Sequence, residues 1–212
     1  MHDPLHIEIF CLGQWMTNCY VVHGQQSCWI VDVGFEPEPM FRFIEQKNLS
    51  VERIVLTHAH VDHIAGLADA AGRFPDAPIA IHESEHNFAA NPELNLSAFL
   101  AEPVSAPTPT ETLVHGDMLE LSGHQFAIRH TPGHSPGGIT LYQPQMAVAL
   151  VGDTLFDGSI GRHDFPTSSF TQLQQSIREQ LYSLPDQTRV LPGHMGPTTI
   201  GKEKATNPFV RD

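Results

Sequence analysis

The stretch that decides the fold is Arg53-Ile54-Val55-Leu56-Thr57-His58-Ala59-His60-Val61-Asp62-His63. Its apolar run, Ile54 to Leu56, is typical of a buried β-strand. Residues with metal-binding side chains follow that run at once, and ligand sites in α/β folds commonly lie at the carboxyl ends of strands. We therefore predict that residues 58–63 form a ligand loop at the end of a buried strand.

Three imidazoles and one carboxylate lie within this ligand loop. Neutral imidazole nitrogen and carboxylate oxygen are ligands that suit zinc, iron and manganese. Because alternate residues of an extended loop point the same way, His58 and His60 are expected to share one metal, while Asp62 and His63 turn toward a second. A loop of solvated histidines is the alternative, and the close spacing disfavours it.

Three single residues farther along the chain share one context, a predicted strand followed by glycine and then a donor residue. They are His134, Asp153 and His194. With the ligand loop they make seven candidate donors, which divide into two sets: His58, His60 and His134 for one metal, and Asp62, His63 and His194 for the other. Asp153 is expected to bridge the two metals, because a carboxylate has two oxygens. Two metals about 3.5–4 Å apart share one hydroxide, which forms near neutral pH.

The remaining sequence alternates between strand-like and helix-like segments, which predicts an α/β fold of two packed sheets flanked by helices. Strands are predicted over residues 7–12, 18–22, 28–33, 53–56, 79–82, 118–121, 125–130, 138–142, 146–151 and 189–191. Helices are predicted over residues 37–47, 64–72, 169–183 and near 201–206, with another beginning at Ser84. The proline-rich residues 91–110 are interpreted as a surface excursion, so residues 1–212 are expected to form a single domain.

Composition narrows the classes of partner. The 212 residues carry 24 acidic and 11 basic side chains, a formal charge of -13, which disfavours nucleic acid and anionic membranes as partners. The first five residues show neither a signal peptide nor a transmembrane helix, so we expect a cytoplasmic protein. Cys11, Cys19 and Cys28 lie in predicted strands without a CxxC motif, and buried, reduced thiols are expected.

These motifs resemble the metallo-β-lactamase superfamily along nearly the whole chain. The resemblance rests on residues 31–34, 58–63, 133–135, 152–154 and 193–194. It implies a four-layer αββα sandwich with two divalent metals, most often zinc and in some members iron or manganese. Residues 152–156, 159–166 and 196–209 are similar to short bacterial proteins of the glyoxalase II (hydroxyacylglutathione hydrolase) branch. We expect the chain to lack the C-terminal helical domain that binds glutathione in full-length glyoxalase II. Met195 stands where this subgroup commonly has glycine.

The resemblance also implies a reaction and several roles. A thioester such as S-lactoylglutathione would be hydrolysed to a hydroxy acid and a thiol, with Asp62 and Asp153 acting as catalytic residues alongside a metal-bound hydroxide. Arg162 occupies the place of a basic substrate-binding residue, and Asp32 is expected to support the ligands by hydrogen bonds. A solvated surface arginine and a plain turn carboxylate are the alternatives for these two residues.

Three other activities stay open. A persulfide dioxygenase, which uses one iron held by two His and one Asp, is a sister branch with similar residues near Arg162. A lactonase or phosphodiesterase would use the same metals. A metal-dependent binding module without catalysis is disfavoured by the complete set of donors.

Overall fold

The computed structural model describes residues 4–211, and its internal contacts divide the chain into two compact parts. The first part comprises residues 4–113 and 120–125, and the second comprises residues 114–119 and 126–211. Residues 1–3, where the segment predicted to lack a targeting signal begins, lie outside the described residues. The single domain over residues 1–212 stays a prediction.

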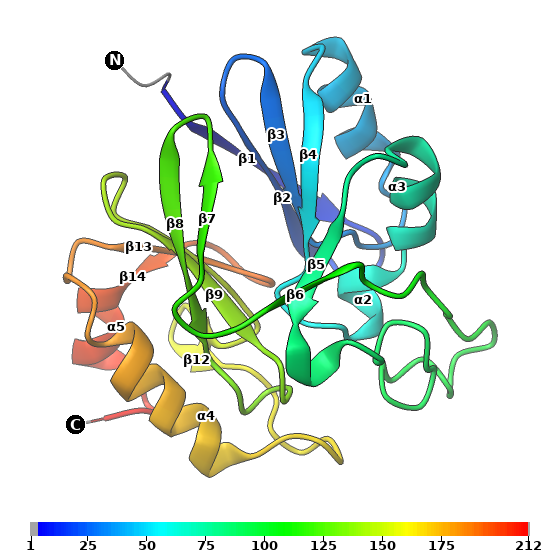
Figure 1. The fold of residues 1–212 in the computed structure, drawn as a ribbon. Coiled ribbons are helices and arrows are strands. Elements are labelled where there is room, and N and C mark those ends of the chain that lie inside the picture. Colours follow the sequence, from blue (N-terminus) through cyan, green and yellow to red (C-terminus); the bar gives the residue numbers. More distant parts are fainter. Residues whose placement is uncertain (1–3, 212) are drawn as a thin grey trace. The chain divides into compact units, whose positions relative to one another are not determined.

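The first part is built on a six-stranded sheet in the simple order β1-β2-β3-β4-β5-β6 (Figure 1). Its strands are β1 (His6–Leu12), β2 (Thr17–His23), β3 (Ser27–Val31), β4 (Ser50–Val55), β5 (Ile79–His82) and β6 (Glu111–Leu113). Strands β1, β2 and β3 are antiparallel, whereas β3, β4, β5 and β6 run parallel. The parallel strands end at the same edge, which places the ligand loop directly after β4.

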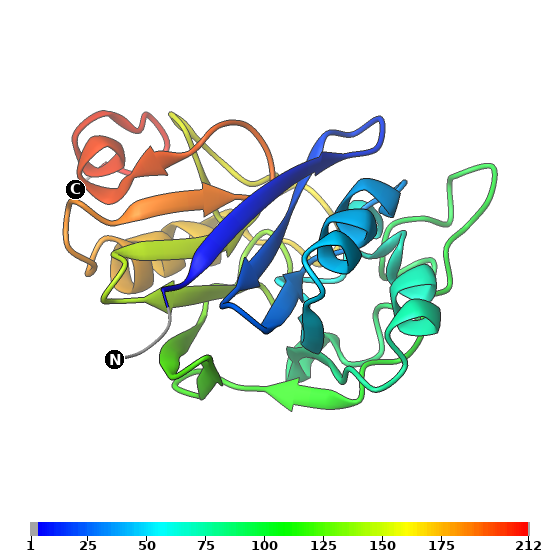
Figure 2. The same cartoon turned by 90° about the horizontal axis from the view of Figure 1, so that it is seen from above.

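Helices cover one face of this sheet, and both Figure 1 and Figure 2 show α1 and α3 on the same side of it. The helices are α1 (Glu38–Gln46), α2 (Val61–Ile64) and α3 (Leu67–Arg73). Met40, Phe41 and Ile44 recur at helical spacing and are buried against the sheet, as predicted for this segment. They pack with strand residues such as Val21 and Ile54 in one core, so hydrophobic burial holds the sheet on which the ligand loop is mounted.

The second part has its own six-stranded sheet, in the order β14-β13-β10-β9-β8-β7. Its strands are β7 (Met118–Leu121), β8 (His124–His130), β9 (Ile139–Gln143), β10 (Val148–Gly152), β13 (Arg189–Pro192) and β14 (Thr198–Thr199), beside a small pair, β11 (Leu155–Phe156) and β12 (Ser159–Ile160). Helix α4 (Phe170–Ser176), the π-helical turn η2 (Ile177–Leu181) and α5 (Ile200–Thr206) lie along it (Figure 1). Leu173 and Ile177 share a core with Val151 of β10 and Val190 of β13.

Three helix predictions are wrong in detail. The helix predicted over 64–72 is two helices, α2 and α3, because the chain bends at Gly66, where a Cβ would come within 2.6 Å of the Gly34 carbonyl oxygen. The helix predicted from Ser84 is a single 3-10 turn, η1 (Glu83–Glu85), because the Glu85 side chain turns into the core. The helix predicted over 169–183 changes from α to π geometry after Ser176.

The cysteine prediction is confirmed for two residues and wrong for the third. All three thiols are free, and Cys19 and Cys28 are buried, but Cys11 is exposed because it lies on the edge strand β1. Among the described residues, no helix combines the length and the apolar character that crossing a bilayer requires.

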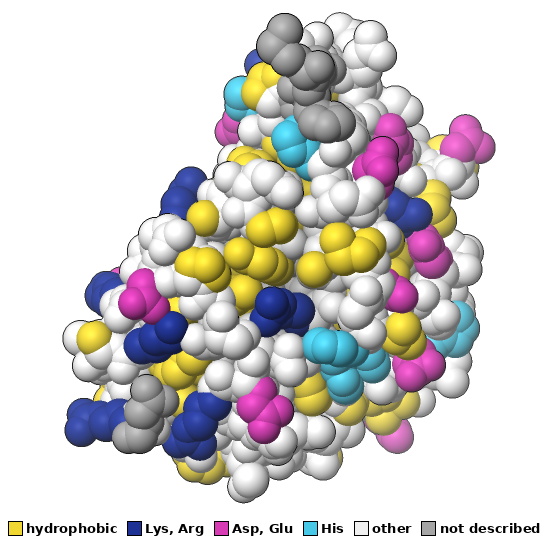
Figure 3. All heavy atoms as spheres, turned by 60° about the vertical axis from the view of Figure 1, so that its left-hand side comes forward, with side chains coloured by type: hydrophobic (Ala, Val, Ile, Leu, Met, Phe, Trp, Pro, Cys, Tyr) yellow, Lys and Arg dark blue, Asp and Glu magenta, His cyan; other side chains and the backbone are white. Residues whose placement is uncertain are grey.

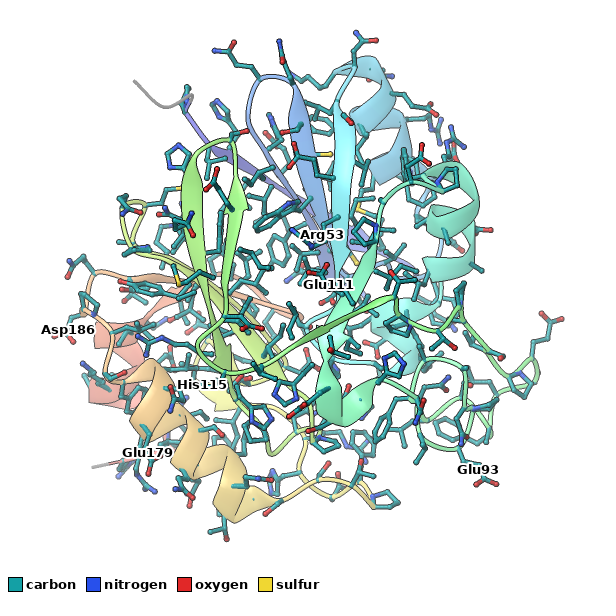
Figure 4. All side chains as sticks on the ribbon, viewed as in Figure 1. Arg53, Glu93, Glu111, His115, Glu179 and Asp186 are labelled. Atoms are coloured by element: carbon teal, nitrogen blue, oxygen red, sulfur yellow. The ribbon has the colours of Figure 1, made fainter. Side chains whose placement is uncertain are left out.

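Ion pairs join several of the charged surface residues. Figure 3 shows Lys and Arg side chains gathered at the lower left of the face that it draws. In the second part, Lys202 pairs with Asp157 and Lys204 with Asp186. In the first part, Arg53 of β4 and Glu111 of β6 lie side by side (Figure 4) and pair at 2.8 Å across the intervening strand β5. This ion pair links β4, the strand that precedes the ligand loop, to β6.

Candidate metal centre

The ligand loop of the first part brings three imidazoles together. His58 and His60 lie between β4 and α2, and His63 lies in the first turn of α2. The ring centroids of His58 and His60 are 4.7 Å apart, and those of His58 and His63 are 4.1 Å apart. All three are at most 3% exposed, and the Asp62 Oδ2 atom lies 3.5 Å from the His63 Nε2 atom. The four donors of the ligand loop therefore lie close together in this part, while their division between two metals stays a prediction.

Asp32 is the buried partner of this cluster. It follows β3 in a left-handed conformation, with φ of +61°. Its Oδ2 atom accepts hydrogen bonds from His63 Nδ1 at 2.8 Å and from the Thr57 hydroxyl at 2.7 Å, while its Oδ1 atom accepts one from the Thr57 amide. A histidine that donates through Nδ1 carries its lone pair on Nε2, the atom that faces the cluster.

The same logic extends to His58 and Asp62. Because the Thr57 hydroxyl donates to Asp32, it accepts from His58 Nδ1 at 3.2 Å, which again places the imidazole lone pair on Nε2. The hydroxyl of Thr17, at the start of β2, donates to Asp62 Oδ2 at 3.0 Å. Neither Thr17 nor Thr57 was singled out from sequence. Because Thr57 directly precedes His58, the sequence could have suggested it as a hydrogen-bond partner of the ligand loop. Thr17 lies far from the loop in the sequence, and nothing in its position suggests such a role.

The second part assembles the other three donors. His134 follows β8, and Asp153 and His194 follow the neighbouring parallel strands β10 and β13. The Asp153 Oδ2 atom lies 3.5 Å from the Nε2 atoms of both His134 and His194. The His134 Nδ1 atom donates to the backbone carbonyl of Arg162 at 2.8 Å, so its lone pair also lies on Nε2.

Close packing restrains the backbone at two of these donors, Asp153 and His134. A Cβ on Gly161 would come within 1.9 Å of the Asp153 carbonyl oxygen, so only glycine fits beside Asp153. A Cβ on Gly133 would meet the backbone of Leu173 at 2.2 Å, which holds the His134 loop against α4. The Ser168 hydroxyl donates to the His134 carbonyl at 2.6 Å. Sequence reasoning did not single out Gly133, Gly161 or Ser168 as supporting residues.

Arg162 lies on the surface beside these donors. Its guanidinium forms a fork with the Asp164 carboxylate, at 2.9 and 3.1 Å, and lies over the Phe165 ring at 4.2 Å. The hydrogen bonds of this fork lower the pKa of Asp164 and raise that of Arg162. The fork uses the Nε and Nη2 atoms of Arg162, so the Asp164 carboxylate orients the guanidinium.

The chemistry of the donors fits a divalent transition metal in both parts. Neutral imidazoles with defined tautomers and a nearby carboxylate are the ligands that zinc, iron and manganese prefer. Histidine ligands of metals typically donate their other ring N–H to a carboxylate or a carbonyl, as His63 and His134 do here.

Comparisons with known proteins agree with this chemistry. The sequence profile of the Metallo-beta-lactamase superfamily matches residues 12–194. The chain is 34% identical to hydroxyacylglutathione hydrolase GloC of Haemophilus influenzae, over 97% of the chain and 98% of the relative. It is 35% identical to the probable metallo-hydrolase YqgX of Bacillus subtilis, over 94% of both proteins.

Solved structures agree as well. The BLEG-1 B3 metallo-beta-lactamase is similar with a TM-score of 0.91 and 35% identity, over 97% of the chain and 99% of that protein. TTHA1623 in a di-iron-bound form gives a TM-score of 0.85 at 35% identity, over 96% of the chain and all of that protein. These likenesses confirm the predicted mixed α/β fold with sheets flanked by helices.

Proposed function

The chain belongs to the metallo-beta-lactamase superfamily and is a metallo-hydrolase, and from that premise we propose that it is a thioesterase of the glyoxalase II type. Its substrate would be S-lactoylglutathione or a related thioester, and its products a hydroxy acid and a thiol. The observation that carries the proposal is the tautomer control of His63 by Asp32 and of His134 by the Arg162 carbonyl. The 34% identity to GloC supports the thioester as the substrate class.

In this proposal the donors of both parts hold two divalent ions, with zinc as the expected metal and iron or manganese as alternatives. His58, His60 and His134 would hold one ion, and Asp62, His63 and His194 the other, with Asp153 shared. The di-iron form of TTHA1623 supports iron as a real alternative to zinc. When bound, such a pair of ions polarises the substrate carbonyl and supplies hydroxide near neutral pH.

The remaining roles belong to the protein's own side chains. The Asp62 carboxylate is oriented by the Thr17 hydroxyl, and we assign to its Oδ1 atom the proton of the attacking water. Asp153 would fix the direction of attack, and the Arg162 Nη1 atom, which the Asp164 fork does not use, would bind a substrate carboxylate.

The decisive experiment measures thiol release from S-lactoylglutathione by protein loaded with zinc, manganese or iron. We expect turnover and a content of two metals per chain. In Asp153→Ala we expect the turnover to be abolished and the metal content to fall. Asp157→Ala removes a surface carboxylate that pairs with Lys202 and serves as the matched control, with full activity expected. Oxygen consumption with glutathione persulfide would instead indicate a dioxygenase, and hydrolysis of a β-lactam alone would indicate a lactamase. If none of these three metals supports turnover of the thioester, the persulfide or a β-lactam, the proposal that the protein is a thioesterase is refuted.

A further inference from the structure

We infer that Glu85 is a positioning residue for the ligand loop, holding the Ala59 amide so that the two imidazoles on either side of it keep their directions. The inference rests on the proposed function, because it assigns the loop to metal binding. It adds a residue that lies outside the loop and outside every motif named from the sequence.

The first observation is a buried carboxylate aimed at the loop backbone. Glu85 ends the turn η1, directly after β5, and is completely buried. Its Oε2 atom accepts a hydrogen bond from the Ala59 N–H at 2.6 Å. Ala59 stands between His58 and His60, so this one bond restrains the peptide units on which both imidazoles are carried.

The second observation is that another backbone amide of the ligand loop, that of Val61, is bound by a residue that lies ten positions after Glu85. The Asn95 carbonyl accepts the Val61 N–H at 2.8 Å, and the Asn95 side chain donates to the carbonyls of Ala89 and Val104. Asn95 is itself fully buried. The amides on both sides of His60 are therefore fixed by residues 85–95, and the segment predicted as a plain surface excursion forms a support for the ligand loop.

The choice of a carboxylate indicates more than general packing. Burying a charge is unfavourable unless hydrogen bonds and nearby opposite charges compensate for it. The hydrogen bond from the Ala59 N–H to the Glu85 Oε2 atom offsets part of this cost, which gives the buried side chain a specific partner in the ligand loop. Glu93 in the same segment shows the contrast, since its exposed side chain points outward at the edge of the molecule (Figure 4).

The test compares metal affinity across matched variants of the full chain, by competition of zinc with a chromophoric chelator. Glu85→Ala and Glu85→Asp both leave the Ala59 amide without its acceptor, the latter because its side chain is one methylene shorter, and we expect zinc affinity to fall about 10- to 100-fold in both. Glu85→Gln keeps an acceptor oxygen at full length and is expected to stay within a few-fold of the parent protein. Faster hydrogen exchange of the Ala59 amide in the metal-free Ala and Asp variants is the second readout.

Two controls separate positioning from folding. Glu203 is an equally buried carboxylate in the second part, where it accepts hydrogen bonds from Gly158 and Asn207, so Glu203→Ala should lower stability and leave zinc affinity unchanged. Glu93→Ala should change neither quantity. Parent-like affinity and exchange in Glu85→Asp would overturn the inference, as would equal losses in Glu85→Asp and Glu85→Gln. If Glu85→Ala does not fold, the Asp and Gln variants still decide.

The outcome is separate from that of the proposed function. Parent protein that binds zinc but hydrolyses no thioester would refute the thioesterase and leave the Glu85 comparison fully readable. Parent protein that binds none of zinc, manganese or iron would refute both.

Discussion

The Asp32 carboxylate accepts the Nδ1–H of His63 at 2.8 Å, with both side chains almost completely buried. This bond fixes the ring orientation and the tautomer of a candidate ligand from a residue 31 positions earlier. The same carboxylate also binds the amide and the hydroxyl of Thr57, so it ties the start of the ligand loop to its end.

Replacing Asp32 by Asn should weaken metal binding more than it weakens the fold. Asn tolerates the left-handed backbone at this position, but its amide nitrogen cannot accept the His63 N–H. We expect metal affinity to fall about 10- to 100-fold, as measured by chelator competition. Asp69→Asn, on the surface of α3, is the control, and equal affinities in the two variants would contradict the assignment.

Gly161→Ala should displace Asp153. The new Cβ would meet the Asp153 carbonyl oxygen at 1.9 Å and the His134 Cβ at 3.1 Å, so the backbone must move. We expect the unfolding free energy to fall by about 3 kcal/mol, at the upper end of the usual cost of overpacking. We also expect the metal content to fall. Gly72→Ala places its Cβ in open space within α3 and should raise stability by up to about 1 kcal/mol. Urea denaturation of both variants checks the pair.

Met195→Gly should stabilise the chain. Met195 adopts a φ of +68° directly after His194, a conformation that costs a non-glycine residue about 1–2 kcal/mol. Part of this gain is offset by the larger entropy of glycine in the unfolded chain, so we expect a net rise of about 0.5–1 kcal/mol in the unfolding free energy. Met195→Ala keeps the Cβ and should show no such rise, and a parallel rise in both variants would exclude backbone strain as the cause.

Stability should fall at high pH through Cys28. Burial, with a smaller contribution from Glu52, raises the pKa of its thiol from 9.0 to about 12. Above pH 9 the unfolded state therefore releases a proton that the folded state retains, so the unfolding free energy decreases as pH rises from 9 toward 12. Other groups titrate in this range, so the measured quantity is the stability difference between the parent protein and Cys28→Ala. A difference that does not shrink across this window would contradict the prediction.

Local patterns in the sequence predicted the strands well, both where every residue is buried, as in β5, and where exposed and buried residues alternate, as in β7. Strands over residues 79–82 and 118–121 match β5 and β7 in both bounds. The helix predicted from Ser84 failed because tertiary packing of Glu85 outweighed the local helical pattern. The two-residue strands β11, β12 and β14 are too short to show any periodicity.

For the candidate site, the sequence indicated the donors that lie close together along the chain. It did not indicate the residues of other segments that hydrogen-bond to the ligand loop. The cluster of His58, His60 and His63 follows from their spacing along one loop. Glu85 and Asn95 act on that loop from a separate segment, and a single sequence gives no sign of such contacts. The meeting of the ligand loop with His134, Asp153 and His194 stays a prediction from the resemblance and the shared strand–glycine–donor context.

The Gly193 amide donates to the Gly152 carbonyl at 2.9 Å, which extends the pairing of β10 and β13 up to the residues before Asp153 and His194. Strand spacing in a sheet, about 4.8 Å, therefore sets the separation at which these two donors leave the backbone. The sheet of the second part therefore sets the backbone positions of both donors before their side chains are considered. Metal uptake by this half should consequently be rapid, with a rate governed by shedding of the ion's water shell and with little change in circular dichroism on loading.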